Sequence, residues 1–479
     1  MFPTNPSTPP PAYDEKPQRE YKQGPSSPRE ASAAPSHSNM FPAGRWRDLW
    51  AALLFYVHLA AVLALAGYSG WLLHEHPIEE FQKLKFEVSL STVALPASLV
   101  LGSIVGGALL SMAVLNVARN APEGTIKAAF FINIGLNVLM TILFISSGSG
   151  VAWFMSVLLV ILSIFMYFMY KRHIPLSAAI LKTVLEVLKE YPGMFNVAFG
   201  SAFLQVCYFA VFVLSCAGVY QMRKLEMVND QAASSIVMFL AFSMLWTSQV
   251  IMNVSLTTIA GTYATFYFLS GSQGQRVRNP TWKSFTRAST WSFGSICFGS
   301  LIVAVIQFLR MLLKRDRRER DLAAAIMDCL LGIIEDLVRY FNYYAFIHVA
   351  IYGKPYMQAG SDVWALLNSN GVMSIINDNI IGTFCFMAAL AISTGSALIT
   401  FLALKFLGAS TELSIASAHA SLIFGAIISR LVLEIVESGA TTTMVCLAED
   451  PSALQRTKPD LYNKLSSAYS SIFYNWRYP

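Results

Sequence analysis

Long apolar stretches constrain the fold of this chain more than any other feature of its sequence. Runs of about 18 or more apolar residues recur along most of its length, and each is long enough to cross the ~30 Å hydrocarbon core of a bilayer as a helix. A helix satisfies its own backbone hydrogen bonds in lipid, whereas an isolated strand does not. The short alternating segments of a transmembrane barrel are not visible. The predicted fold class is all-α, a polytopic integral membrane helix bundle.

Ten membrane-spanning helices can be drawn on this pattern. They cover 49–73, 93–117, 126–146, 151–170, 196–219, 235–268, 288–313, 331–353, 376–404 and 412–436. The composition agrees, because only 13% of the residues are charged, about half the share in soluble domains. Short connections leave no room for an inserted soluble domain. Two connections, 172–193 and the segment beginning "RERDLAAAIMD", are predicted to be amphipathic helices at the membrane surface.

The positive charges near the span ends predict the orientation. With the N-terminus inside, most of the Lys and Arg residues that flank the spans lie on the cytoplasmic side, so both termini are predicted to be cytoplasmic. The basic segment "KRDRRER" (314–320) falls on the opposite side. Either 288–313 or 331–353 is re-entrant, or this cluster is an exception to the rule.

The ends of the chain differ from the transmembrane domain, which we place at 45–450. Residues 1–44 hold 10 of the 20 prolines and are predicted to be a disordered cytoplasmic tail. This tail contains a PPxY sequence formed by Pro10, Pro11 and Tyr13. Such a segment favours the polyproline II conformation that WW-type domains bind. It is either a docking site for a WW-domain ubiquitin ligase or a chance match. Residues 451–479 form a short cytoplasmic tail.

Several classes of function find no support in the sequence. The net charge of +6 is spread over loops and makes no nucleic-acid patch. The six cysteines contain no CxxC pair, so they indicate neither a metal site nor a disulfide framework. No catalytic or phosphate-binding motif is visible. The pair of histidines in "HEH" (74–76) lacks a further ligand. We therefore expect no enzyme activity, no cofactor and no metal.

One face of the sixth predicted span carries polar and aromatic side chains, which are costly inside a membrane. Helical spacing groups Ser243, Trp246, Gln249, Asn253, Thr257, Ala260, Gly261, Ala264 and Tyr267. In one interpretation this face lines a solute pathway, with Trp246 and Tyr267 offering π faces and the two amides offering hydrogen bonds. In the other it is a packing face of small residues and interhelical amide bonds.

The stretch "FNYYAFIHVAIYGKPYMQAG" (341–360) has a second such face. Phe341, Tyr344, His348 and Tyr352 lie on one side of a helix, and 353–355 (Gly-Lys-Pro) ends it. The aromatic side either binds a quaternary ammonium through cation–π attraction or belongs to an aromatic belt at the membrane edge. These four residues and the two aromatics and two amides of the sixth span are the candidates for a substrate pathway.

Two ion pairs are predicted inside the spans. Glu335 and Arg339 stand at i and i+4 in the favourable order on the eighth span. Arg430 and Glu434 repeat that spacing on the tenth span, followed by Glu437. A structural ion pair is a better interpretation of the second set than a proton relay.

Several motifs resemble the choline transporter-like family. They are "FGSICFGSLIVAVIQFLR" (293–310), "FNYYAFIHVAIYGKPYMQAGSD" (341–362), "TIAGTYATFYF" (258–268) and a weakened acidic motif, "TTTMVCLAEDP" (441–451). The resemblance covers most of 45–450 and looks closest to fungal members of the pH nine-sensitive type, whose Pro-rich tail is also similar. Two features depart from the pattern: residues 74–92 are a short connection where animal members have a large glycosylated loop, and Ala448 interrupts the acidic motif.

The resemblance implies a ten-span plasma-membrane protein with cytoplasmic termini. In animal members it also implies sodium-independent movement of choline and related amines such as ethanolamine. Two functions therefore follow. The first is a transporter that lies in the lipid bilayer and moves a small amine or other small polar solute without ATP. The second is a non-transporting scaffold or stress-response protein whose tail recruits a ubiquitin ligase.

Overall fold

The described part of the chain is a set of packed helices. A computed structural model describes residues 40–41, 44–78, 90–146, 150–171, 173–269, 277–315, 322–368, 380–457, 459, 462–463 and 466. All regular secondary structure in these residues is helical. In chain order the helices are α1 (Leu49–Glu75), α3 (Leu90–Asn120), α4 (Pro122–Ser146), α5 (Gly150–Tyr170), α6 (Ile174–Glu190), α7 (Gly193–Lys224), α8 (Asp230–Leu269), α9 (Pro280–Ser289), α10 (Phe293–Arg315), α11 (Leu322–Tyr352), α12 (Tyr356–Asn368), α14 (Ile380–Phe406), α15 (Thr411–Glu449) and α16 (Pro451–Thr457).

Each of the ten predicted spans coincides over most of its described residues with one helix, although the span 288–313 begins at the end of α9. Within the described residues, seven helices are long and apolar enough to cross a membrane: α1, α3 from Ser98 onward, α7, α8, α10, α14 and α15. The other three predicted spans coincide with α4, α5 and α11. The all-α membrane class is therefore confirmed, while the number of ten spans and the side of each terminus stay predictions. The PPxY sequence and most of the 314–320 cluster lie outside the described residues.

Helix α8 is the central element of the bundle. It contacts α7, α9, α10, α11 and α15, and every residue from Ser255 to Phe268 is buried. Several of its hydroxyls are satisfied within the helix, since Thr257, Thr262 and Thr265 each donate to the carbonyl four residues earlier at 2.6–2.9 Å. These three threonines can therefore be buried in the bundle, because none of their hydroxyls is left unpaired.

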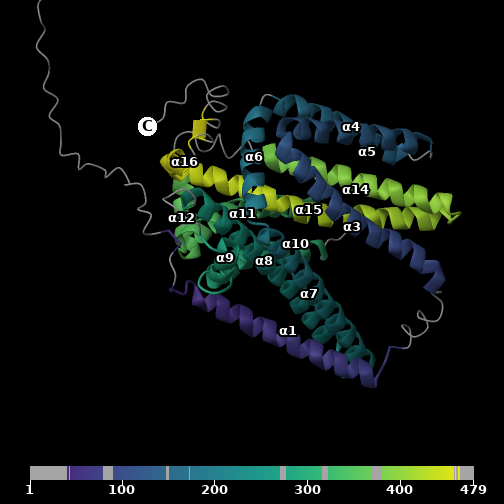
Figure 1. Cartoon of the computed structure of the whole chain (residues 1–479). Helices are drawn as coiled ribbons and strands as arrows, with labels where there is room; N and C mark the ends of the chain where they lie inside the picture. Colours follow the sequence, from purple (N-terminus) through teal and green to yellow (C-terminus); the bar gives the residue numbers. More distant parts are fainter. Residues whose placement is uncertain are drawn as a thin grey trace, which may run out of the picture. The chain divides into compact units, whose positions relative to one another are not determined.

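Several of the other long helices pack against one another in neighbouring pairs (Figure 1). Helices α14 and α15 form a hairpin that packs on α3, and α1 lies beside α7 and α10. The largest apolar core joins residues of α4, α6, α8, α11, α14 and α15. Helix α9 has ten residues, is buried at Pro280, Ser284 and Ala288, and packs on α8.

Helix α6 forms where a surface helix was predicted, and its apolar side is packed within the protein. Eleven of its residues are buried, and it contacts α4 and α15. Lys182, Glu186 and Lys189 are exposed along its other side, as their spacing predicts. The segment predicted as a second surface helix instead continues into α11, which begins at Leu322.

A short segment before α1 crosses the ends of α10, α11 and α12. We call its described residues, 40–41 and 44–48, the strap. The Phe41 amide donates to the Ile351 carbonyl at 2.8 Å, and the Arg47 amide donates to the Trp291 carbonyl at 3.0 Å. Arg47 Nε also donates to the Gly353 carbonyl at 3.1 Å. The strap thus holds the turn that ends α11.

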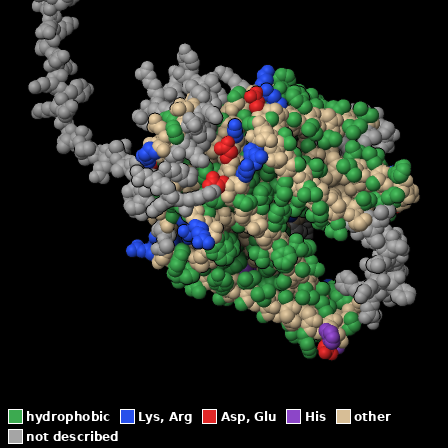
Figure 2. Space-filling view, in the orientation of Figure 1, with side chains coloured by type: hydrophobic (Ala, Val, Ile, Leu, Met, Phe, Trp, Pro, Cys, Tyr) green, Lys and Arg blue, Asp and Glu red, His purple; other side chains and the backbone are tan. Residues whose placement is uncertain are grey.

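Hydrophobic side chains cover most of the face in Figure 2, and the charged side chains gather toward one side of it. The exposed large hydrophobics lie along α1, α3, α5, α7, α11, α14 and α15. This distribution fits helices that face lipid over most of their length and water at their ends.

Candidate functional site

The predicted polar face of α8 packs against α1 and α10. Trp246 is 2% exposed, and its ring stacks on His58 with centroids 4.8 Å apart. Its Nε1 donates to the Cys297 carbonyl at 3.1 Å. His58 Nε2 lies 2.6 Å from Ser243 Oγ on α8. Trp246 of α8 therefore contacts both α1 and α10.

The other predicted residues of that face also make interhelical bonds or are buried between helices. Asn253 Nδ2 donates to Ser300 Oγ at 2.9 Å, and the Tyr267 hydroxyl donates to the Asp450 carbonyl at 3.1 Å. Gln249 is buried. None of these residues lines either of the two large cavities described below, so their role in a solute pathway stays a prediction.

The aromatic stripe of α11 is buried at Tyr344, His348 and Tyr352, and it ends at an acidic group. Tyr344 packs edge-on against Tyr340 with centroids 4.9 Å apart. His348 Nε2 lies 3.1 Å from Glu449 Oε1, and the Tyr352 hydroxyl donates to the other oxygen of the same carboxylate. Glu449, the last residue of α15, is missing from our predicted set.

The sequence feature that could have pointed to Glu449 is the acidic motif at 441–451. Glu449 lies about a hundred positions from His348 in the sequence, so no local spacing predicts that these two residues meet. Phe341, the first residue of the stripe, packs over Gly360 of α12. Like the α8 residues, the four residues of the stripe line neither of the large cavities. Their assignment to a substrate pathway also stays a prediction.

The predicted Glu335–Arg339 ion pair is confirmed, with Arg339 Nη2 2.7 Å from Glu335 Oε1. The structure adds two partners from α10. Gln307 Nε2 donates to Glu335 at 2.9 Å, and Arg310 Nη1 pairs with its second oxygen. Both carboxylate oxygens of Glu335 therefore have partners. Because two of these partners belong to α10, Glu335 joins α10 to α11.

The predicted pairing of Arg430 with Glu434 is wrong. Arg430 Nη2 lies 2.9 Å from Glu437 Oε2, two helical turns away rather than one. A long guanidinium side chain can reach either position on the same side of a helix, and the neighbouring helices decide which one it meets. Glu434 is left facing a cavity between α7, α8 and α15.

This cavity has a volume of about 550 Å³, and we call it the acidic cavity. Apolar side chains make most of its wall. The polar residues that line it are Ser201, Gln205, Ser255, Arg430, Glu434 and Ser438. One Arg and two Glu (Arg430, Glu434, Glu437) carry +1 and −2, so this set has a net charge of −1 when all three are ionised. A carboxylate facing a cavity inside apolar helices attracts a cation.

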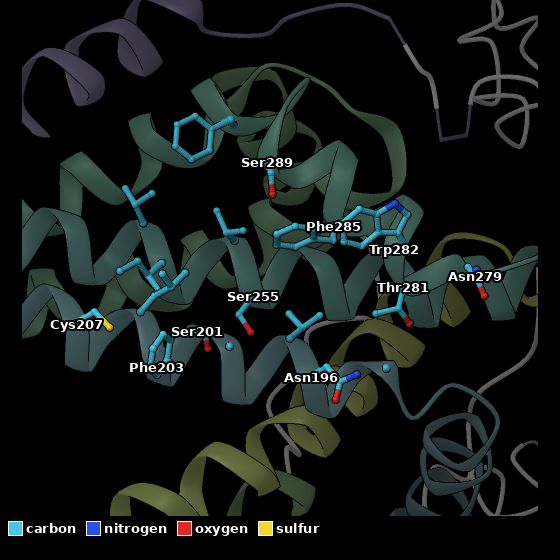
Figure 3. A pocket seen from close by; sticks show the side chains of 18 of the residues that line it. Asn196, Ser201, Phe203, Cys207, Ser255, Asn279, Thr281, Trp282, Phe285 and Ser289 are labelled. Carbon is cyan, nitrogen blue, oxygen red and sulfur yellow. The ribbon is translucent and has the colours of Figure 1, made fainter. Parts of the chain in front are cut away.

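A larger cavity of about 1370 Å³ lies on the other side of the α7–α8 contact (Figure 3), and we call it the lateral groove. Residues of α1, α7, α8, α9 and α10 line it, and nearly all of those within α1, α7 and α8 are apolar or small. It shares Ser201 and Ser255 with the acidic cavity. These two residues of α7 and α8 therefore border both cavities.

Comparison with known proteins identifies related chains. The family described as "Plasma-membrane choline transporter" matches residues 153–452. A CTL-like protein from Dictyostelium discoideum is 30% identical over 443 residues, which cover 90% of this chain and 76% of that protein. Protein PNS1 from Debaryomyces hansenii is 29% identical over 451 residues (89% and 88%). Protein PNS1 from Candida albicans is 31% identical over 412 residues (81% and 78%).

Proposed function

Because this chain belongs to the choline transporter-like family, we propose that it is a membrane transporter for a small organic amine of the choline or ethanolamine kind. The observation that carries the choice of an amine is the Glu434 carboxylate in the wall of the acidic cavity. Arg430 pairs with Glu437, so a cationic solute can supply the charge that Glu434 lacks. A neutral or anionic solute would leave that charge unbalanced.

The size and lining of the acidic cavity support a small solute with hydrogen-bond donors. Its volume of about 550 Å³ falls in the range of small-molecule sites, roughly 300–1,000 Å³. Gln205, Ser201 and Ser255 offer acceptors on the wall opposite α15. None of the described residues that line it is aromatic. We therefore propose that an amino alcohol with N–H donors, such as ethanolamine, binds there more tightly than a quaternary ammonium, which needs aromatic faces.

Transport would be driven by the gradient of the solute or of an ion, because no nucleotide-binding motif is visible in the sequence. We also propose the plasma membrane as the location, since the matching family is described as a plasma-membrane transporter. A fluorescent fusion of the full chain, imaged with a plasma-membrane marker, tests this location. Signal confined to an internal membrane would contradict it.

Flux measurements test the function directly. Labelled ethanolamine and choline are offered to proteoliposomes without ATP, comparing the wild type with Glu434→Gln. We expect saturable uptake, with ethanolamine at the lower KM, and at least a tenfold loss of kcat/KM in the variant. The matched control is Glu412→Gln, which removes an exposed carboxylate from the first turn of α15. Wild-type uptake in Glu434→Gln would refute the acidic cavity as the site, and no uptake of either amine would refute the substrate class.

A further inference from the structure

The lateral groove is larger and more apolar than a site for the proposed amine solute requires. Its volume of about 1370 Å³ exceeds the roughly 300–1,000 Å³ of pockets for drug-sized ligands. Most of its wall within the spans is hydrocarbon, contributed by Leu59, Phe203, Leu204, Val250 and Val254 among others. Such a wall offers few hydrogen bonds to a small hydrophilic amine.

The groove has two chemically different ends (Figure 3). Phe203 and Cys207 mark the apolar end, and Asn196, Asn279 and Trp282 mark the polar end, where α7 and α9 begin. Arg278 also lines the polar end and is exposed. Trp282 is 67% exposed, although tryptophan is usually buried at least in part in proteins. An occupant that complements both ends must be amphipathic.

We propose that the lateral groove binds one glycerophospholipid with a zwitterionic headgroup. The Arg278 guanidinium would hold the phosphate, since this group is suited to bidentate pairing with phosphate oxygens. The Trp282 indole would face the headgroup ammonium, by cation–π attraction. Tryptophan is also typical of the headgroup level of membranes. The acyl chains lie along α7 and α8, toward Phe203 and Val211.

Ser289, one of two buried hydroxyls in the wall, favours a lipid with ester groups over plain hydrocarbon. Thr247 Oγ1 and Ser289 Oγ have no hydrogen-bond partner within the described structure, and both residues line the groove. Thr247 is 4% exposed. A buried hydroxyl without a partner costs free energy, and an acceptor on the occupant removes that cost. The glycerol ester carbonyls of a phospholipid are acceptors of this kind for Ser289, whereas Thr247, next to the Ser248 carbonyl that accepts from Gln205, lies deeper along the groove.

The length of the groove fits an acyl chain. From Asn196 to Val211, the lining residues of α7 span fifteen helical steps, or about 22 Å at 1.5 Å per residue. One leaflet of the ~30 Å hydrocarbon core is about 15 Å thick. The groove can therefore take the hydrocarbon of a lipid from the leaflet next to α9 along its full depth.

Native mass spectrometry of the purified, delipidated full-length protein tests the proposal, with dioleoylphosphatidylcholine as the probe. The filling variant is Gly200→Leu, because Gly200 lines the groove and a Cβ there meets no protein atom within 4 Å. Its control is Gly135→Leu on α4, where a Cβ also meets nothing within 4 Å. We expect one tightly retained lipid in the wild type and in Gly135→Leu, and at least a tenfold weaker adduct in Gly200→Leu.

The headgroup end is tested with Arg278→Gln, whose control is Lys189→Gln at an exposed position of α6. Arg278→Gln is expected to weaken dioleoylphosphatidylcholine several-fold and to leave dioleoylglycerol, which lacks a headgroup, unchanged. Equal retention of both probes by the wild type would overturn the proposal, as would an unaltered adduct in Gly200→Leu or a broad series of weak adducts. Glu434→Gln must keep the lipid, so failure of the amine proposal leaves this test intact.

Discussion

The carboxylate of Asp48 accepts a hydrogen bond at 2.8 Å from the backbone amide of Tyr356, the first residue of α12. Asp48 stands at the N-cap of α1, yet its side chain makes no cap bond to that helix. The same oxygen also accepts from Ser295 Oγ at 2.7 Å. One side chain before α1 therefore caps α12 and binds the start of α10, and it fixes the turn at which α11 ends.

Loss of the Asp48 carboxylate should destabilise the junction of α10 and α12. Asp48→Ala leaves the Tyr356 amide and the Ser295 hydroxyl without this partner, which costs about 1–3 kcal/mol for a partly buried donor. We expect a lower midpoint of thermal unfolding in detergent micelles. The control is Asp230→Ala, whose exposed pair with Arg223 contributes little. Equal midpoints for the two variants would contradict the capping role.

The close approach of the strap to α10 requires a glycine at position 294. A Cβ on Gly294 would overlap the carbonyl oxygens of Arg47 and Asp48, which are backbone atoms and cannot rotate away. Gly294→Ala should therefore cost about 1–3 kcal/mol, the usual range for overpacking. Gly67→Ala on α1, where a Cβ meets nothing within 4 Å, is the matched control. Unfolding midpoints of the two variants in the same detergent check this result.

The lengths of the apolar runs were enough to predict most of the helices, because a helix needs about 20 apolar residues to cross the bilayer. Helix α9 was missed, since "PTWKSFTRAS" has ten residues and no long apolar run. The periodicity of α8 correctly identified a buried face. Periodicity could not separate a packing face from a cavity wall, because both place polar groups inside. The partner of Arg430 depended on packing from α7 and α8, which no spacing along α15 records.

Glu335 binds two arginines of different helices, so its neutralisation should weaken the contact between α10 and α11. In Glu335→Gln the Arg310 and Arg339 guanidinium groups lose their shared carboxylate, which is 7% exposed as a side chain. Arg310 keeps its pair with Asp328 at 3.2 Å, and the Arg339 side chain is 46% exposed, so the cost is that of the lost charge-assisted bonds to Glu335. We expect a clear fall in the unfolding midpoint in micelles. Glu123→Gln, which removes an exposed i, i+4 pair with Lys127, should change it little. A fall of the same size in both variants would argue against the network.

Glu437 does not line the acidic cavity, but it holds Arg430 away from Glu434. We therefore predict that Glu437 determines whether the Glu434 carboxylate is free to bind a cationic solute. In Glu437→Gln, Arg430 loses its partner at 2.9 Å and can turn to Glu434, one turn away on the same side of α15. The carboxylate that we assign to the solute amine would then be neutralised. We expect the KM for ethanolamine to rise several-fold, with a smaller change in kcat. Adding Arg430→Gln to this variant removes the competing cation and should restore much of the affinity. Initial-rate uptake into proteoliposomes measures both values, and a double variant no better than Glu437→Gln would refute the competition.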